Sequence, residues 1–329
     1  MSAKLNVLTV GNAIVDIFAR CDDAFLDHQG IGKSMMNLVD ADRSATLYAA
    51  LDAPQEISGG SAANTAVGIV ALGGSAGFTG RVHDDTLGHS FITDIRAAGV
   101  HFGARPQVDG APTASSIILV TPDASRSMNT YLGACIEFQP DDISEQDVAA
   151  ADIIYLEGYL FDAPAGPDIF QRAATLAERH DTRISLSLSD PWCAERHRDA
   201  LSTFCRDHVD ILFANEEEAT SLCQLDGNAA RDALCADIAE VVITRGAEGA
   251  FVARGDDRHE VDAMPLGAVT DTTGAGDLFA AGYLFGRTNG YGVRESGVIA
   301  SIAAGEVISH IGARPDQNLA ALADAGLVG

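Results

Sequence analysis

The sequence predicts an α/β fold in which a mostly parallel sheet carries helices on its faces. From about residue 151 onward, strand-like and helix-like patterns alternate, which is typical of parallel strands joined by helical crossovers. The 329 residues, of which 47% are hydrophobic, are enough to bury a large core. No internal repeat, coiled coil or low-complexity tract interrupts the pattern.

The C-terminal half contributes most of the predicted sheet. We expect strands at 152–156, 183–188, 209–214 and 241–244, with 249–254 as a hairpin partner of the last, and helices near 167–179 and 193–207 and from Gly274 and Arg294. The N-terminal half supplies strands at Leu5–Val10 and Ala76–Thr79 and helices at 61–72 and 86–98. Two segments, at about 14–50 and 104–138, break this rhythm and are predicted to form a small β lid inserted into a single domain that spans residues 1–329.

The composition argues against several classes of partner. Lys and Arg total 21 against 47 for Asp and Glu, a net charge of -26 that repels nucleic acid and anionic membranes. No run of about 18 apolar residues and no signal-like segment is present, so we expect a cytoplasmic protein. The six cysteines form no CxxC pair and the nine histidines no HExxH motif, so free thiols are expected and no zinc site.

Residues 271–277 read DTTGAGD and combine a glycine-rich turn with the start of a helix. The apolar residues that follow at near-helical spacing predict that the helix begins at about Gly274, with Thr273 as N-cap. Its first amides, at Gly274, Ala275 and Gly276, have no intrahelical partner, so they can bind an anion such as a γ-phosphate. An ordinary N-capped helix packed through small residues also explains this segment, so the rest of the sequence has to decide between the two interpretations.

Asp277 falls in the first turn of this predicted helix, beside the anion. A carboxylate at that place can orient or deprotonate an acceptor hydroxyl that attacks a γ-phosphoryl group. We expect the helix dipole to lower its pKa.

Two polar segments of the N-terminal half are candidates for binding the acceptor. Asn12 and Asp16 follow the first strand, at the edge where open α/β sheets bind ligands, and an aspartate paired with an amide can hold a sugar diol. Gly59 and Gly60 leave the backbone bare before a small-residue helix that carries Asn64. A polar turn leading into the lid explains the first segment equally well, and the second lacks the spacing of a dinucleotide-binding fold.

Two further strand ends reach the same predicted edge. Asn215 with Glu218 forms a capping-box pattern, and an amide and a carboxylate at this place also suit hydrated magnesium; the two roles can coexist. Thr244 and Gly246 follow the next strand and are expected to meet the nucleotide phosphates.

Together these segments resemble the PfkB family of carbohydrate and nucleoside kinases, also called ribokinase-like, over essentially the whole chain. Gly59-Gly60 with Asn64 is similar to the first family signature, DTTGAGD to the second, and Asn215 with Glu218 to the NxxE magnesium motif. The resemblance implies a ribokinase-like three-layer sandwich with a β lid, ATP and Mg²⁺ as cofactors, and Asp277 as catalytic base. A lid would keep water from competing with the acceptor.

Within this family the chain is most similar to the adenosine kinases. Gly11-Asn12 with Asp16 resembles the ribose-binding entry, and residues 126–135 resemble the lid strand that closes on the nucleoside. By that similarity Arg126 approaches the transferred phosphate, although an exposed lid arginine is the alternative. Met36, Tyr159 and Phe161 either stack on a purine or occupy half-buried core positions.

The resemblance also bears on cations. Asp271 and Thr273 match positions that supply part of a monovalent cation site, such as one for K⁺, in other members, with residues 312–316 as a second part. The expected reaction is transfer of the γ-phosphoryl group of ATP to the primary hydroxyl of a nucleoside, adenosine to AMP, by a monomer or homodimer.

Three alternatives remain at this point. A sugar kinase of the ribokinase, fructokinase or 2-keto-3-deoxygluconate kinase type needs no base-stacking residues, and a sugar acid needs basic residues that the predicted lid lacks. A sensor that binds nucleoside without turnover is disfavoured by the presence of Asp277. An NAD-linked oxidoreductase would bind nicotinamide.

Overall fold

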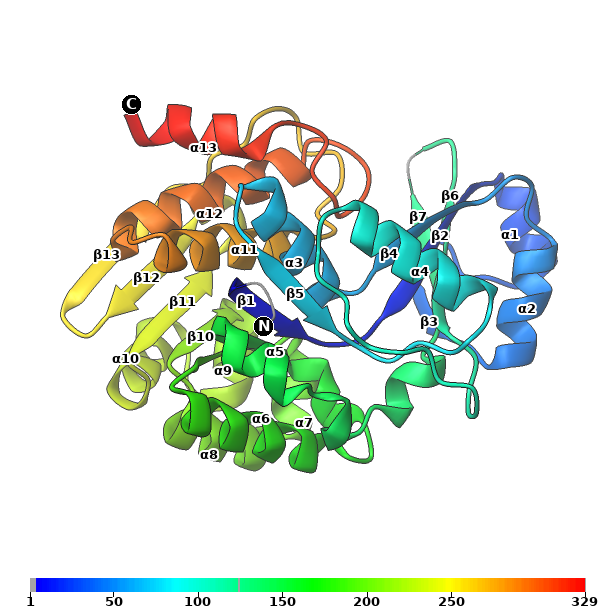
Figure 1. The fold of residues 1–329 in the computed structure, drawn as a ribbon. Coiled ribbons are helices and arrows are strands. Elements are labelled where there is room, and N and C mark those ends of the chain that lie inside the picture. Colours follow the sequence, from blue (N-terminus) through cyan, green and yellow to red (C-terminus); the bar gives the residue numbers. More distant parts are fainter. Residues whose placement is uncertain (1–3, 124, 329) are drawn as a thin grey trace.

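The chain folds into two sheets of unequal size, which lie side by side in the molecule (Figure 1). The structure is a computed structural model and describes residues 4–123 and 125–328. Within these residues the larger sheet has eight strands in the order β13-β12-β11-β10-β9-β8-β1-β5. The strands β1, β5, β8, β9, β10 and β11 are parallel, while β12 and β13 are antiparallel to their neighbours.

The strands of the larger sheet are β1 (Leu5–Val10), β5 (Ala76–Thr79), β8 (Ala151–Glu157), β9 (Arg183–Ser187), β10 (Ile211–Asn215), β11 (Glu240–Thr244), β12 (Ala250–Arg254) and β13 (Asp257–Val261). Because the first six are parallel, their carboxyl ends meet at one edge, where ligands bind in open α/β sheets. The predicted α/β class is confirmed.

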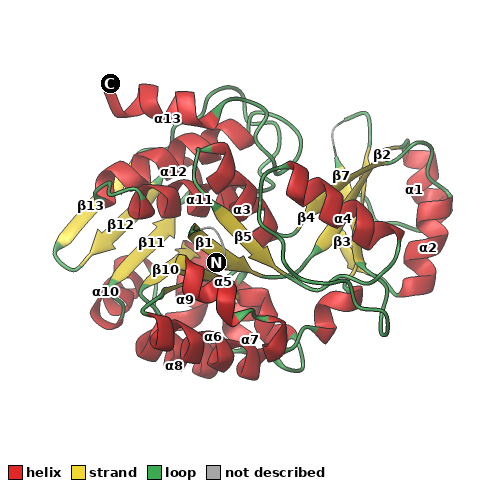
Figure 2. Cartoon of the chain, viewed as in Figure 1, coloured by secondary structure: helices red, strands yellow, loops and turns green. Residues whose placement is uncertain are grey.

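Helices cover both faces of this sheet, which gives three layers (Figure 2). One face carries α3 (Ser61–Ala71), α11 (Ala275–Thr288), α12 (Val293–Val307) and α13 (Leu319–Val328). The other carries α5 (Glu145–Ala150), α6 (Gly166–His180), α7 (Pro191–Arg196), α8 (Arg198–His208), α9 (Glu216–Cys223) and α10 (Gly227–Asp237). Four 3₁₀ turns connect elements in the described chain: Gly133–Glu137, Pro140–Asp142, Gly158–Asp162 and Gly246–Glu248.

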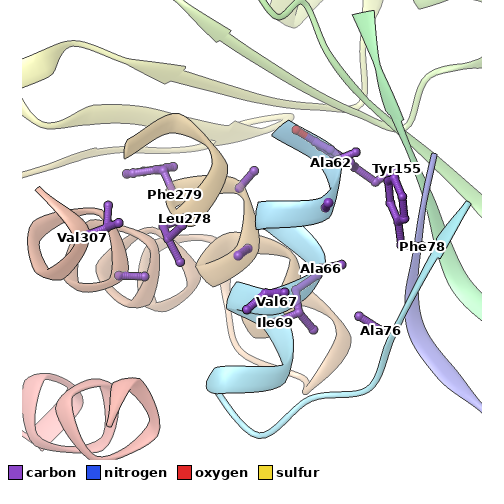
Figure 3. Packing of buried hydrophobic residues seen from close by; sticks show 14 of the residues in the cluster. Ala62, Ala66, Val67, Ile69, Ala76, Phe78, Tyr155, Leu278, Phe279 and Val307 are labelled. Carbon is purple, nitrogen blue, oxygen red and sulfur yellow. The ribbon is translucent and has the colours of Figure 1, made fainter. Parts of the chain in front are cut away.

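Helices α3 and α11 pack against one another in the core of the first face (Figure 3). A Cβ placed on Gly68 of α3 would lie 2.6 Å from the Cβ of Ala281 and 2.7 Å from Leu278 on α11. Only glycine therefore allows this close approach. The packing matters for function because it sets the start of α3 beside the start of α11.

The smaller sheet, called the second sheet below, has five strands among the described residues in the order β3-β7-β6-β2-β4. They are β2 (Ile14–Arg20), β3 (Met36–Leu38), β4 (Gln55–Gly59), β6 (Ala114–Val120) and β7 (Arg126–Tyr131). The helices α1 (Asp23–Gln29), α2 (Ala41–Ala49) and α4 (Thr86–Ala97) accompany it (Figure 1).

Several predicted boundaries differ from the structure. Strand β4 lies outside both segments expected to form the lid, because its letters, QEISG, carry no apolar run. The helix expected near 193–207 is interrupted at His197, where ψ is 18°, and becomes α7 and α8. The short strand β13 and the helices α1 and α2 were not expected.

Candidate active site

The start of α11 differs by one residue from the sequence prediction. The N-cap is Gly274, with φ 79° and no side-chain capping bond, so the prediction of Thr273 as N-cap is wrong. Glycine is required there, since a Cβ would lie 2.7 Å from the Cβ of Ala313 and the backbone is left-handed. At Gly276, in contrast, an added Cβ would meet nothing within 4 Å. The Ala275 amide, expected to face an anion, instead donates to the Thr272 carbonyl over 3.2 Å. The open space therefore lies beside Gly276 in the first turn of α11, where an anion can approach the helix start.

Asp277 is fixed by two side chains of α3. The hydroxyl of Ser61 donates to its Oδ1 over 2.6 Å, and the amide Nδ2 of Asn64 donates to its Oδ2 over 3.0 Å. The hydroxyl of Thr65 donates to the Asp277 carbonyl over 3.2 Å. Asn64, predicted to bind the acceptor, is thus also a partner of the predicted base.

The pKa of Asp277 is raised above its ordinary value, so the expectation of a lowered pKa is wrong. Burial of the carboxyl is the main cause, and the hydrogen bonds from Ser61 and Asn64 act in the opposite direction. The argument from the helix dipole considered only the local sequence, whereas in the fold the carboxyl packs against the start of α3 and is desolvated there. A raised pKa makes Asp277 a better proton acceptor.

The glycine pair before α3 packs against the predicted acceptor residues. A Cβ on Gly59 would lie 2.2 Å from Oδ2 of Asp16, and one on Gly60, where φ is 96°, would lie 2.1 Å from the Asn12 carbonyl oxygen. These glycines therefore let the loop after β1 and the strand β2 reach the start of α3. Burial raises the pKa of Asp16 to about 7, with Arg314 and Arg126 opposing the shift and Asp277 adding to it.

Glu157, the last residue of β8, belongs to the same cluster and was missed by the sequence analysis. Its side chain is 1% exposed. Its Oε1 accepts from Nδ2 of Asn12 over 2.9 Å, and its Oε2 accepts from the Ala62 amide over 3.1 Å. Burial raises its pKa to about 7, and the charge of Asp277 contributes. The signal in the sequence was an acidic residue directly after a buried apolar strand at the binding edge.

Arg126 reaches the DTTGAGD turn from strand β7 of the second sheet. Its Nη1 donates to Asp271 and, over 2.7 Å, to the hydroxyl of Thr273. Its Nε and Nη2 are buried without a hydrogen-bond partner among the described residues. A guanidinium with two unpaired donors beside a helix N-terminus fits an anionic group.

Asp271 is held from several sides. Its Oδ1 accepts from the amide and hydroxyl of Thr273, and its Oδ2 accepts from the Gly312 amide over 2.9 Å as well as from Arg126. Burial works against ionisation, but the hydrogen bonds of Gly312 and Thr273 and the charge of Arg126 hold its pKa below the ordinary value. The fold thus brings Asp271, Thr273 and the start of segment 312–316 together, as expected, while a cation role for them stays a prediction.

Asn215 and Glu218 form the capping box that the sequence indicates. The Glu218 amide donates to Oδ1 of Asn215, and the amide and Nδ2 of Asn215 donate to the two carboxylate oxygens of Glu218, all within 2.8 to 2.9 Å. Burial raises the pKa of Glu218 to about 7. Thr244 pairs in register with Asn215 on the neighbouring strand, and a Cβ on Gly246 would meet nothing within 4 Å.

A cavity of about 680 Å³ opens beside Asp16 and Asn64. Its apolar lining includes Phe18 and Ile57. Both lie on the same face of the second sheet as Asp16, because Phe18 is two residues further along β2 and Ile57 is the residue paired with Asp16 on β4. Arg314 forms part of its polar wall. Asp277 is not part of the lining, but Asn64, which donates to Asp277, is. The cavity can therefore hold the body of an acceptor beside the predicted base.

The three residues considered for purine stacking are not brought together. Phe161 is 5% exposed and packs in the core with its ring centroid 4.1 Å from that of Phe170, so it is a core residue. Met36 is 60% exposed on the edge strand β3. Tyr159 is half-buried beside Asp190, and its pKa is raised by burial and by that carboxylate.

One group of side chains has metal-ligand geometry without zinc-like spacing in the sequence. Ligand atoms of Asp162, Cys193 and His197 lie within 4.8 Å of one another. The Asp162 carboxylate, however, is held by Nε and Nη2 of Arg196 over 3.0 and 2.9 Å. Burial raises the pKa of Cys193 to about 12, which keeps the thiol protonated. We interpret the group as an ion-pair cluster.

Comparison with known proteins identifies the family of this chain. The profile of the pfkB family of carbohydrate kinases matches residues 30–319, and the chain belongs to that family. It is therefore a phosphotransferase that acts on an alcohol group.

Three relatives illustrate the likeness. The adenosine kinase of Saccharomyces cerevisiae is 30% identical over 313 residues, 88% of this chain and 90% of that protein. The solved adenosine kinase of Sinorhizobium meliloti is 48% identical with a TM-score of 0.87, covering 98% of this chain and 99% of that one. A solved probable sugar kinase of Rhizobium etli is 45% identical with a TM-score of 0.89, covering 99% and 100%. In the part of the chain that the structure describes, no helix is long and apolar enough to cross a membrane.

Proposed function

We propose that this kinase transfers the γ-phosphoryl group of ATP to the primary 5′ hydroxyl of a nucleoside, converting adenosine to AMP. The observation that carries the proposal is the juxtaposition of Asp277, with its raised pKa, and the open space beside Gly276 at the start of α11. A hydroxyl seated between them has a proton acceptor on one side and the phosphate site on the other.

In this proposal the chain contributes position and charge to a loose phosphoryl-transfer transition state. The Gly276 amide and the unpaired donors of Arg126 offset the charge that develops on the transferred group. Asp277 orients the acceptor hydroxyl and receives its proton late. Asp16 accepts hydrogen bonds from the ribose diol, and Asn64 holds Asp277 toward the acceptor.

Magnesium fits this chain through water and not by direct contact with Glu218. Both carboxylate oxygens of Glu218 already accept hydrogen bonds from Asn215, and direct ligation would break the capping box. Each oxygen keeps a lone pair that a water of hydrated Mg²⁺ can use. When bound with ATP, the ion would neutralise phosphate charge. A monovalent cation near Asp271 remains a separate expectation, which is tested by comparing activity with and without potassium.

A nucleoside is favoured over a bare sugar by the wall of the cavity. Asp16 shares one face of the second sheet with Phe18 and Ile57, so a group that binds a diol adjoins apolar surface. A ribose with an attached base matches both parts, and the volume of about 680 Å³ falls within the usual range for small-molecule sites. The likeness to adenosine kinases supports the same acceptor.

A sugar kinase is the second candidate, because the Rhizobium etli relative, described as a probable sugar kinase, matches almost as closely. Its acceptor would use Asp16 and leave the apolar wall unfilled. For such a kinase, an acceptor that lacks the purine would bind as tightly as a nucleoside.

The test is ATP consumption across adenosine, other nucleosides, ribose, fructose and 2-keto-3-deoxygluconate, each with and without potassium, beside Asp277→Ala. We expect turnover with adenosine that exceeds turnover with ribose by at least tenfold in kcat/KM. Turnover with free sugars and none with nucleosides would replace this proposal by the sugar kinase.

A further inference from the structure

Asn64 bridges the predicted base and an arginine that lies far away in the sequence. Its Nδ2 donates to Oδ2 of Asp277 over 3.0 Å, while its Oδ1 accepts from Nε of Arg314 over 3.4 Å. The three residues come from α3, α11 and the segment that follows α12.

The chemistry of the two neighbours decides which way the amide of Asn64 points. An ionised carboxylate only accepts hydrogen bonds, and a guanidinium only donates them. With Asp277 on one side and Arg314 on the other, the amide has one orientation that satisfies both. Without Arg314, a half-turn about the last side-chain bond would present an oxygen to the carboxylate, which is repulsive.

Arg314 is itself held firmly. Its Nη2 donates to the carbonyl of Ser58 and, over 2.7 Å, to the Ser58 hydroxyl. That hydroxyl donates to Oδ2 of Asp94 over 2.5 Å, and Nη1 of Arg314 lies 3.7 Å from the same oxygen. A chain of contacts therefore runs from Asp94 on α4 to Asp277 on α11.

We propose that Arg314 is a positioning residue for Asp277: its guanidinium fixes the amide of Asn64 so that Nδ2 always faces the catalytic carboxylate. This inference rests on the proposed function of Asp277. It assigns a role toward the predicted base to a residue that lies in the wall of the acceptor cavity and contacts Asn64.

The first consequence concerns turnover. Arg314→Met should lower kcat about tenfold at unchanged KM for ATP, because the nucleotide site is intact while the base loses its orientation. Arg314→Lys, which can still donate to Asn64, should recover most of kcat. Arg96→Met is the matched control: Arg96 also donates to a backbone carbonyl, that of Phe102, but does not touch Asn64, and its loss should leave kcat unchanged.

A double-mutant cycle separates positioning from a structural role. If Arg314 acts through Asn64, then Arg314→Met in an Asn64→Ala background should cause no further loss of kcat. Equal losses in both backgrounds would overturn the inference, as would normal turnover of Asn64→Ala. Thermal unfolding of each variant shows that the comparison is made on folded protein.

A second readout does not depend on activity. The pKa of Asp277 can be followed by carboxyl NMR in selectively labelled protein, with Asp277→Asn to assign the signal. Arg314→Met should raise this pKa, because a hydrogen bond to the charged form is lost, and should change it clearly less in the Asn64→Ala background. The ionisable groups facing Asp277 are Asp16 from β2 and Tyr155 and Glu157 from β8. Because the charge of Arg314 lowers the pKa of Asp16, Arg314→Met also changes the ionisation of Asp16, and this effect is present in both backgrounds.

The two failures can be told apart. A wild type that phosphorylates no acceptor ends the proposed function, while the NMR titration still decides the role of Arg314. An unchanged Asp277 pKa in Arg314→Met, or an equal rise in both backgrounds, overturns the inference even if the enzyme is active.

Discussion

The hydroxyl of Ser61 donates a 2.6 Å hydrogen bond to Oδ1 of Asp277, although 216 positions separate the two residues. Ser61 is the first residue of α3, and Asp277 lies in the first turn of α11. The bond therefore joins the starts of two helices at the carboxyl edge of the sheet. With Asn64 on the other oxygen, the carboxylate has a fixed plane and keeps lone pairs for an acceptor hydroxyl.

Replacing Asp277 by Asn should abolish most turnover and leave the fold intact. The amide keeps the size of the side chain but cannot receive the proton, so kcat should fall by about 10³-fold, within the usual range for general bases. ATP affinity, measured by titration with a fluorescent analogue, should change little. Ser61→Ala removes only one orienting bond and should cost far less; equal losses in the two variants would show that Asp277 acts through structure.

Arg126→Met should lower kcat by roughly 10²-fold, because it removes the donors that face the transferred phosphoryl group. Its partner Asp271 would lose one of several hydrogen bonds but keep those of Thr273 and Gly312, so folding should survive. Steady-state kinetics with adenosine and ATP measure the effect, and circular dichroism confirms the fold. A wild-type kcat in Arg126→Met would mean that Arg126 only stabilises the contact between the second sheet and the DTTGAGD turn.

Local patterns predicted much of the local structure around the candidate site correctly. The DTTGAGD turn, the capping box of Asn215 and Glu218, and the strand ends at one sheet edge depend on residues close in sequence, where spacing and capping chemistry suffice. The same locality explains the wrong pKa of Asp277. Its dipole environment is local, but its burial is caused by α3, which is distant in the chain.

The contacts that the sequence did not predict show the same limit. Arg314 donates to Asn64 although 250 positions separate the two residues, and no sequence pattern around either residue predicts that contact. Phe161 was considered for purine stacking or for a core position, and its burial against Phe170 of α6, which decides for the core, depends on a contact between distant segments. Glu157 was within reach of sequence reasoning, since it directly follows the strand predicted at 152–156.

The buried carboxyl of Glu157 should make stability depend on pH near neutrality. Its pKa rises from 4.5 in the unfolded chain to about 7 in the fold, so the folded state binds the proton more tightly. The stabilisation from this group is fully present below pH 4.5 and is lost as the pH rises to about 7, by at most roughly 3 kcal/mol. The Glu157→Gln variant carries a neutral amide at this position, so this contribution to the pH dependence of stability is absent from it.

Chemical unfolding at pH 4.5, 6 and 7.5 checks the prediction. The free energy of unfolding of Glu157→Gln relative to wild type should increase over this interval. Asp16, whose pKa is also raised to about 7, titrates in both proteins and largely cancels in the difference. A difference that stays constant with pH would mean that Glu157 is already ionised in the fold at low pH.

Alanine at two neighbouring glycines should separate a structural effect from a functional one. Gly274→Ala forces a left-handed residue and brings its Cβ to 2.7 Å from that of Ala313, so its melting temperature should fall by several degrees. Gly276→Ala lies in helical backbone with open space around the new methyl, and helix propensity favours alanine by up to about 1 kcal/mol. Its melting temperature should therefore stay the same or rise.

Because that open space is where the transferred phosphate is proposed to lie, Gly276→Ala should nevertheless lose at least tenfold in kcat/KM for ATP. A stable Gly276→Ala enzyme with unchanged kinetics would place the phosphate elsewhere along the sheet edge.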